Sequence, residues 1–224
     1  MRTGLKFKSI SSTLGIAVAL LHPGIGLADI IIQNVTAVTD MGSLNSNTTP
    51  DKMVDGSGLT GGSLDSFAGL HDDADSTGWK SLTTKGTITF NLGALYVLDA
   101  FGVWNHAQLD GDRGVRDVLV EISADGVNFS PLVGGPTQFA RAPSAPVSAE
   151  VFTFPDVSAA YVRFDVFDGY GAINTGIAEV RFRATAAAVP EPDAFSLLFT
   201  SLCLASLLLW RRRRAILAAR LPRG

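Results

Sequence analysis

The chain of 224 residues has almost no cysteine, and Cys203 is the only one. A single thiol excludes a disulfide within the chain and every zinc site built on several cysteines. Cys203 lies in an apolar stretch near the C-terminus, which also excludes a soluble cysteine nucleophile. An exported domain in this chain must therefore depend on its core, or on a bound metal, for stability.

Recognisable catalytic motifs are missing as well. Only His71 and His106 lie beyond residue 28, and there is no Gly-x-Ser-x-Gly elbow, His-Glu-x-x-His pair or P-loop. A carboxylate pair for glycoside hydrolysis stays open, because 19 acidic residues between residues 29 and 189 always allow some pairing. Nothing singles out one pair, and we expect a protein that is not an enzyme.

The charge is unevenly distributed along the chain. The whole chain has a net charge of −3, but residues 29–189 hold nine lysines and arginines against 19 aspartates and glutamates, a net charge of −10. An acidic surface argues against nucleic acid and anionic membranes as partners. It is compatible with divalent cations and neutral sugars.

Apolar runs are short, and one lies near each end of the chain. Residues 14–21 follow three basic residues and precede small residues that end at Ala28, the order of a secretory signal peptide, so we expect signal peptidase to remove residues 1–28. Residues 194–210 carry no charge and would form a helix of about 25 Å, close to the bilayer core of about 30 Å. The basic tail, residues 211–224, favours the cytoplasmic side. The sequence predicts an exported chain with a transmembrane helix.

The C-terminal features occur in a specific combination: Val189, Pro190, Glu191 and Pro192, then the span, then Arg211, Arg212, Arg213 and Arg214. This combination resembles the PEP-CTERM sorting signal of Gram-negative bacteria. The resemblance implies an inner-membrane precursor, cleavage by exosortase near Pro-Glu-Pro, and delivery to the cell surface or the extracellular biofilm matrix. Residues 215–224 depart from the usual ending at the arginines. A plain membrane anchor would have the same span and basic flank.

The middle of the chain alternates apolar and polar residues with period two, as in residues 116–123, 161–167 and 177–183. Further strands are expected at 87–92, 97–104, 127–132 and 149–154. Many short strands separated by Gly, Asp and Pro predict an all-β fold, a jelly-roll β-sandwich, over residues 29–184. Residues 41–78 and 133–148 are expected as long loops, and residues 185–193 as a linker with the Pro-Glu-Pro motif.

Four segments follow one another in a familiar order: "DGSGLT" (55–60), "GWKS" (78–81), "RGVRDVLVEISADGVNFS" (113–130) and "GIAEVRF" (176–182). They resemble a discoidin domain, the coagulation-factor type C and galactose-binding-like family, over about 150 residues. The family implies an eight-stranded jelly roll, often with a structural calcium ion. It binds glycans, lipids or protein surfaces through loops at one end.

Calcium prefers several oxygen ligands. The resemblance implies that Asp55, Thr60 and Glu179 meet around one calcium ion, with backbone oxygens near Met53 and Ser57. From the residues alone, Asp55 is a turn residue. The acidic residues 71–75 are expected in a solvated loop, and whether they bind a metal stays open.

Ligand-binding candidates lie at the end of a predicted strand and in the loops near it: Trp104, Asn105, His106, Arg113 and Tyr170. These residue types stack on sugars and form hydrogen bonds with them. Alternatively, Trp104 belongs to the core and Asn105 stabilises a turn. The resulting hypothesis is a surface-sorted module that recognises carbohydrate, such as an exopolysaccharide. The alternative is a structural or adhesion protein of the matrix with protein partners.

Overall fold

The structure is a computed structural model that describes residues 29–61 and 66–185. The predicted signal peptide, the Pro-Glu-Pro motif, the span and the arginines lie outside the described residues. Within the described ranges, no helix is long and apolar enough to cross a membrane.

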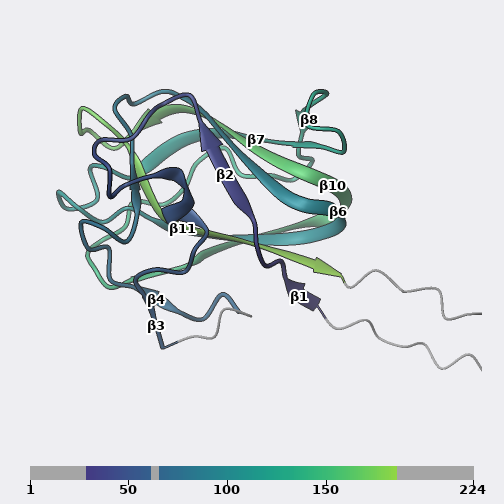
Figure 1. Cartoon of the computed structure of the whole chain (residues 1–224), viewed down its shortest axis with the longest axis horizontal. Helices are drawn as coiled ribbons and strands as arrows, with labels where there is room; N and C mark the ends of the chain where they lie inside the picture. Colours follow the sequence, from purple (N-terminus) through teal and green to yellow (C-terminus); the bar gives the residue numbers. More distant parts are fainter. Residues whose placement is uncertain (1–28, 62–65, 186–224) are drawn as a thin grey trace, which may run out of the picture.

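Two strands of 20 residues each, β6 (Gly86–Asn105) and β10 (Glu150–Gly169), form the centre of the fold. They pair antiparallel from Gly86–Val166 to Val103–Glu150. The register shifts between Thr153 and Val157 and again after Ala159, where the two-stranded ribbon bends. Each long strand therefore contributes one half to each of two layers (Figure 1).

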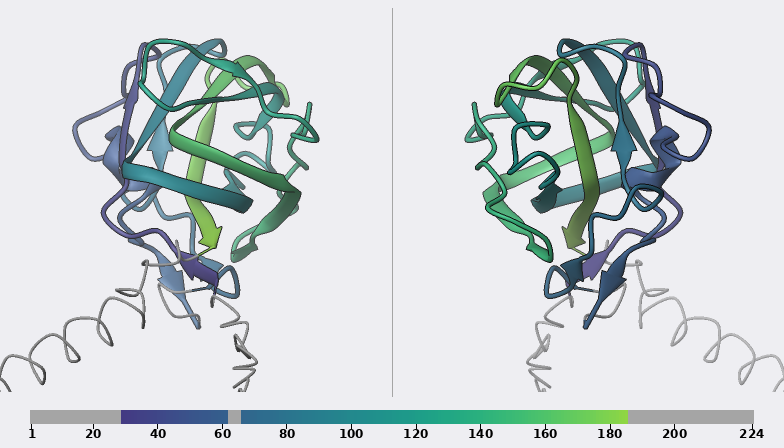
Figure 2. Two further views of the ribbon diagram at one scale, coloured as in Figure 1. Left: turned by 90° about the vertical axis from the view of Figure 1, so that its right-hand side faces the viewer. Right: turned by 90° about the vertical axis from the view of Figure 1, so that its left-hand side faces the viewer.

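Shorter strands complete the two layers. One layer joins the first half of β6 and the second half of β10 to β2 (Thr36–Thr39), β7 (Val115–Ser123) and β8 (Ser130–Pro131). The other layer joins the remaining halves to β1 (Asp29–Ile31), β5 (Trp79–Lys80) and β11 (Gly176–Thr185). Figure 2 shows the strands wrapped around one interior, which is the predicted all-β sandwich.

Phenylalanines from both layers meet in this interior. Phe90 in one layer lies 5.2 Å from Phe182 in the other, measured between ring centroids, and Phe101 lies 5.5 Å from Phe164. All four rings are buried. Burying one such side chain stabilises the fold by roughly 1.5–3 kcal/mol, so these rings contribute to the stability of the sandwich.

The long loops contain more structure than the sequence predicts. Residues 41–78 include a 3-10 helix, η1 (Pro50–Met53), and two strands, β3 (Leu59–Thr60) and β4 (Leu70–His71). In the other loop, β9 (Val147–Ser148) pairs with β4 to complete a three-stranded sheet. A second apolar cluster around Trp104, Val147 and Ala178 packs this sheet against the outer face of β6 and β11.

The predicted strand at residues 127–132 is reduced to β8 in the structure. The carboxylate of Asp125 accepts the backbone N–H groups of Val127 and Asn128, at 2.9 and 2.8 Å. These N–H groups are therefore committed to a turn and cannot join a strand ladder.

Candidate functional site at the loop end

Three connections meet at the end of the sandwich where β6 finishes and β11 begins: residues 81–85, 106–114 and 170–175. The Arg113 Nε–H donates to Asn174 Oδ1 at 3.1 Å, and the Asn174 side-chain amide donates to the Ser81 carbonyl at 3.1 Å. The Ala172 N–H donates to the Asp112 carbonyl at 3.1 Å. These hydrogen bonds hold the three segments together, and we call this surface the loop end.

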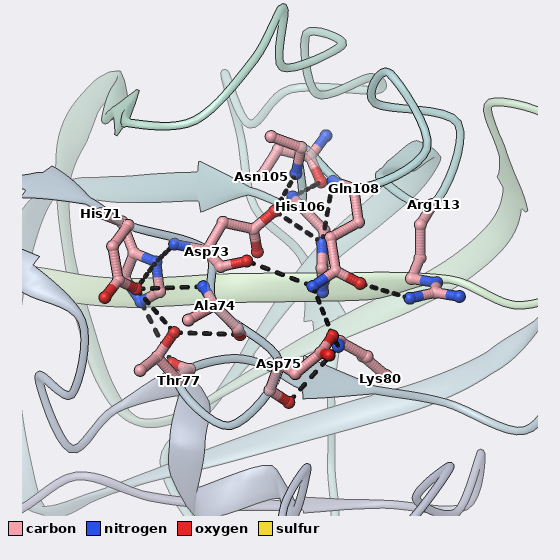
Figure 3. A network of polar contacts seen from close by, with 12 residues as sticks. His71, Asp73, Ala74, Asp75, Thr77, Lys80, Asn105, His106, Gln108 and Arg113 are labelled. Carbon is pink, nitrogen blue, oxygen red and sulfur yellow. Dashed lines mark hydrogen bonds and ion pairs between the residues drawn. The ribbon is translucent and has the colours of Figure 1, made fainter.

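Among the predicted ligand residues, Arg113 and Tyr170 are half-buried, whereas Trp104, Asn105 and His106 are buried. The Arg113 Nη1–H donates to Gln108 Oε1 at 2.6 Å. The Gln108 side-chain amide in turn donates to the Asp73 carbonyl and to Asp75 Oδ1, at 3.2 and 2.9 Å. Figure 3 shows Gln108 lying between Arg113 and the acidic segment.

Beneath Gln108 lies a buried pair, Asp73 and His106. His106 Nδ1 lies 2.9 Å from Asp73 Oδ2, which also accepts the Ala107 N–H at 2.7 Å (Figure 3). Burial lowers the pKa of His106, and the neighbouring Asp73 carboxylate opposes this effect. Within the described part of the chain, Asp73 Oδ1 and His106 Nε2 are buried without a hydrogen-bond partner.

The acidic residues 71–75 are therefore not simply a solvated loop. Asp72 and Asp75 are exposed as expected, but Asp73 is 4% exposed. The buried ammonium group of Lys80 lies 2.7 Å from Asp75 Oδ1 and donates to the Asp75 carbonyl at 3.3 Å. A side-chain cation thus pairs with Asp75 in this segment, which the charge pattern alone did not indicate.

The other predicted ligand residues serve the fold. Trp104 is fully buried and donates its indole N–H to the Gly69 carbonyl at 2.8 Å. Asn105 is also buried, and its side chain bonds to four backbone groups. The Tyr170 hydroxyl donates to the Phe139 carbonyl at 2.5 Å. In this arrangement Trp104, Asn105 and His106 have no exposed ring or amide to offer a ligand, which corrects their predicted direct contact.

Part of the predicted calcium set does come together. The Gly56 N–H donates to Glu179 Oε2 at 3.2 Å, which brings the loop of Asp55 and Ser57 to the start of β11. Glu179 is fully buried. Burial raises the pKa of Glu179 to about 8, although the Arg181 guanidinium 3.1 Å away favours the charged carboxylate.

Thr60 does not turn toward this loop, since it is exposed in β3 and donates its hydroxyl to the Leu70 carbonyl at 3.2 Å. Thr77 lies against the loop instead, with its carbonyl 3.4 Å from the Ser57 hydroxyl. The sequence carries no local signal for this contact, because 20 residues separate the two. Met53 is buried beside the loop.

The carboxylate and hydroxyl oxygens of Asp55, Ser57 and Glu179 are ligands of the kind that a divalent cation binds. The two carboxylates, however, already form ion pairs with basic side chains. Asp55 Oδ2 lies 2.7 Å from the Lys52 ammonium, and Glu179 pairs with Arg181. Among the described residues no three His, Cys, Asp or Glu side chains gather around a common point. A calcium ion would have to displace at least one of these two cations.

Two pockets of about 330 Å³ each hollow the described surface. One lies beside Asp55 and Arg181, and the other is lined by Arg141, Glu150 and the prolines of residues 140–150. Neither of these two is lined by Arg113.

The sequence model of the F5/8 type C domain matches residues 34–180. The chain belongs to this family, and the predicted discoidin-like β-sandwich is confirmed. No curated protein is similar in sequence at a significant level.

Solved carbohydrate-binding modules share the fold. The module CpGH89CBM32-5 from Clostridium perfringens, in complex with GalNAc-β-1,3-galactose, is 16% identical with a TM-score of 0.51, over 68% of this chain and 98% of the module. CBM32-1 from a family 31 glycoside hydrolase of the same organism is 15% identical, with a TM-score of 0.50, 68% coverage of this chain and 95% of that one. Truncated AlyQ, with CBM32 and alginate lyase domains, is 16% identical with a TM-score of 0.50, over 73% of this chain and 35% of that chain.

Proposed function

We propose that this protein is a non-catalytic module that binds carbohydrate through its loop end. The observation that carries the proposal is Arg113, a half-buried guanidinium that two neutral amides hold in place while other N–H groups stay free. Family membership supports it, as does the shared fold of a Clostridium perfringens module that holds GalNAc-β-1,3-galactose.

The chemistry of the loop end suits a sugar. Guanidinium N–H groups that are fixed in direction donate to sugar hydroxyls with little loss of side-chain entropy. Leu109 and Ile173 are 60% and 92% exposed, and they offer an apolar surface to the C–H face of a ring.

We further propose that the chain is exported and sorted by exosortase, so that the module reaches the cell surface or the matrix. The support is the sequence alone: a signal peptide, the Pro-Glu-Pro motif, an apolar span and four arginines in order. A structural calcium ion at Asp55, Ser57 and Glu179, with Thr77 beside them, is part of the same proposal. The ion would supply positive charge between two segments that are distant in sequence, and these residues would hold it.

A structural or adhesion role in the matrix is the second candidate. Leu82, Leu109 and Ile173 are exposed on three adjoining loops, an arrangement that also suits protein contact. Protein partners would then replace sugar as the ligand.

A glycan array probed with the full-length chain in mild detergent tests the main proposal. We expect binding that is lost in Arg113→Gln and retained in Arg116→Gln, because Arg116 already pairs with Asp117 and Asp168 on the side of the sandwich. A folded protein that binds no sugar, or whose sugar binding survives Arg113→Gln, contradicts the proposed site.

A further inference from the structure

A buried pair lies beneath the segment that carries Gln108 and Arg113. His106 is fully buried and Asp73 is 4% exposed, and His106 Nδ1 lies 2.9 Å from Asp73 Oδ2. Because a carboxylate accepts hydrogen bonds, the neutral ring carries its proton on Nδ1 and its lone pair on Nε2. In the part of the chain that the structure describes, this Nε2 is buried without a hydrogen-bond partner. The surroundings therefore satisfy the neutral ring but offer no acceptor to a second N–H.

The charged groups that act on His106 come from three elements. They are Asp73 between β4 and β5, Lys80 in β5 with its partner Asp75, and Arg113 in the loop after β6. Burial lowers the pKa of His106, Asp73 opposes this effect, and the charges of Lys80 and Arg113 lower it further. From β11, Gly176 faces the ring, since a Cβ atom added there would lie 2.5 Å from His106 Cδ2. Protonation would thus add positive charge where two cations already act on the ring.

Asp73 connects His106 to the ligand-binding arginine. Asp73 Oδ2 accepts the Ala107 N–H at 2.7 Å, and the Asp73 carbonyl accepts the Gln108 side-chain amide at 3.2 Å. Gln108 Oε1 in turn accepts the Arg113 Nη1–H at 2.6 Å. A displacement of Ala107 and Gln108 from Asp73 would therefore remove one of the supports of the Arg113 guanidinium.

The turn that follows Gln108 has an unfavourable backbone geometry. Leu109, Asp110 and Gly111 have φ angles of 56°, 57° and 84°, a left-handed turn. A residue with a Cβ atom adopts this geometry at a cost in energy, and burial does not offset that cost because Leu109 and Asp110 are exposed. The Gly111 N–H closes the turn by donating to the Ala107 carbonyl at 2.9 Å. Exposed segments of this kind open before a packed core does, so we expect residues 107–111 to open first.

We infer that His106 is a positioning residue for Arg113, and that protonation of its ring opens residues 107–111 and releases Arg113 from Gln108. This inference rests on the proposed carbohydrate-binding function and adds its regulation by pH. In the open turn the ring meets water, where an imidazolium finds its second acceptor. Protonation therefore favours the open form, and a sugar then binds to a smaller population of ordered loop ends.

Hydrogen–deuterium exchange of the full-length chain in mild detergent, at pH values from about 5.5 to about 7.5, tests the opening. After correction for the intrinsic pH dependence of exchange, protection of the Ala107 and Gly111 N–H groups should fall by up to about tenfold per pH unit below about 6.5, the pKa of an exposed histidine. In His106→Gln this protection should not depend on pH. The N–H groups of β10, which pairs on both sides, report global unfolding and should stay more strongly protected.

A glycan array probed with a dilution series of the full-length chain, at pH values of about 7.5 and about 5.5, tests the link between protonation and binding. For the parent, sugar affinity should fall by up to about tenfold per pH unit over the range in which the turn opens. In His106→Gln it should change little. Gln108→Ala is the second variant, because it leaves the buried pair in place. Its turn should still open in acid, whereas its sugar affinity, already reduced, should depend less on pH.

Three results would overturn the inference. Equal protection of the turn and of β10 at every pH means that His106 titrates only on global unfolding. A pH dependence that survives His106→Gln but disappears in His71→Gln places the effect on the other buried histidine, whose Nδ1 accepts the Asp73 N–H at 2.9 Å. Sugar affinity that stays constant while the turn opens removes the positioning role.

A fourth result separates this inference from the proposed function. Acid opening of the turn that is lost in His106→Gln, with no glycan bound at any pH, supports the release by His106 and contradicts carbohydrate binding at the loop end.

Discussion

Burial decides whether a polar residue near the loop end stabilises the fold or is available to a ligand, and burial cannot be read from the sequence. Asn105 has the residue type of a sugar ligand, yet its side chain is used up by the backbone groups of Val115, His106 and Ala140. Arg113 is also a residue type that binds sugars, but only two of its N–H groups form hydrogen bonds, with Asn174 and Gln108. Asn105 differs from Arg113 because backbone groups that are distant in the sequence occupy its side chain.

His106 makes the stability of the domain depend on pH. Burial lowers its pKa below the usual 6.5, while Asp73 opposes this and the charges of Lys80 and Arg113 add to it. The unfolded chain then binds a proton on this histidine at a pH where the folded chain does not. Stability from this group is therefore lost as pH falls below about 6.5.

Urea denaturation in the presence of chelator, at several pH values between about 5 and 7, measures this effect. We expect His106→Gln to reduce stability near neutral pH by about 1–3 kcal/mol, because it disturbs a buried hydrogen bond. The further loss on acidification should be smaller than in the parent. Glu179 acts in the opposite direction, since its raised pKa favours the folded state as pH falls from about 8, so the difference between variant and parent is the quantity to compare. Parallel pH profiles would contradict the role of His106.

At the scale of the strands, some features are predictable from the local sequence and others are not. Period-two alternation correctly places Val162, Phe164 and Val166 inside. The two halves of β6 are expected as separate strands, at 87–92 and 97–104. In the structure Gly93 adopts a φ of 84° and the strand continues through the bend. Glu179 and Arg181 become buried because β3, β4 and β9 cover the outer face, and these short strands pair only through distant residues.

The left-handed turn at residues 109–111 is an element whose strain can be measured. Leu109 gains little from burial because it is 60% exposed, and asparagine tolerates a positive φ better than leucine does. Leu109→Asn should therefore stabilise the domain by about 0.5–1 kcal/mol in urea denaturation. The same change removes the apolar contact and should weaken sugar binding. Loss of stability in Leu109→Asn would show that the turn is not strained.

At the scale of the whole molecule, the two ends of the described domain lie together and away from the loop end. Asp29 in β1 pairs with Thr185 at the end of β11. The start of β11, at Gly176, follows the loop end directly, and a strand of ten residues spans about 30 Å. A module held at a surface through the end of β11 would thus present Arg113, which Asn174 holds at the loop end, away from that attachment.

Calcium would act at this scale by joining segments that are 124 residues apart, Asp55 and Glu179. A metal that binds only the folded state adds about 2.7 kcal/mol at a hundredfold excess over its dissociation constant. We expect a higher melting temperature in calcium than in chelator, and most of that gain should vanish in Asp55→Asn and in Glu179→Gln. Asp72→Asn is the matched control, because Asp72 is exposed in the neighbouring acidic segment. No calcium-dependent gain in the parent, or a gain lost only in Asp72→Asn, would remove the proposed site.

Under the proposed exosortase sorting, cleavage would determine whether the binding module leaves the membrane. If exosortase recognises Pro190, Glu191 and Pro192, then Glu191→Ala should leave a full-length form in the membrane fraction of the native host, while the parent appears as a shorter, released form. Asp193→Ala is the control, since it removes the adjacent carboxylate without altering the motif. Immunoblots of membrane and culture fractions distinguish the two forms. Glu191→Ala that is shortened and released like the parent would mean that Pro-Glu-Pro is only a turn before a membrane anchor.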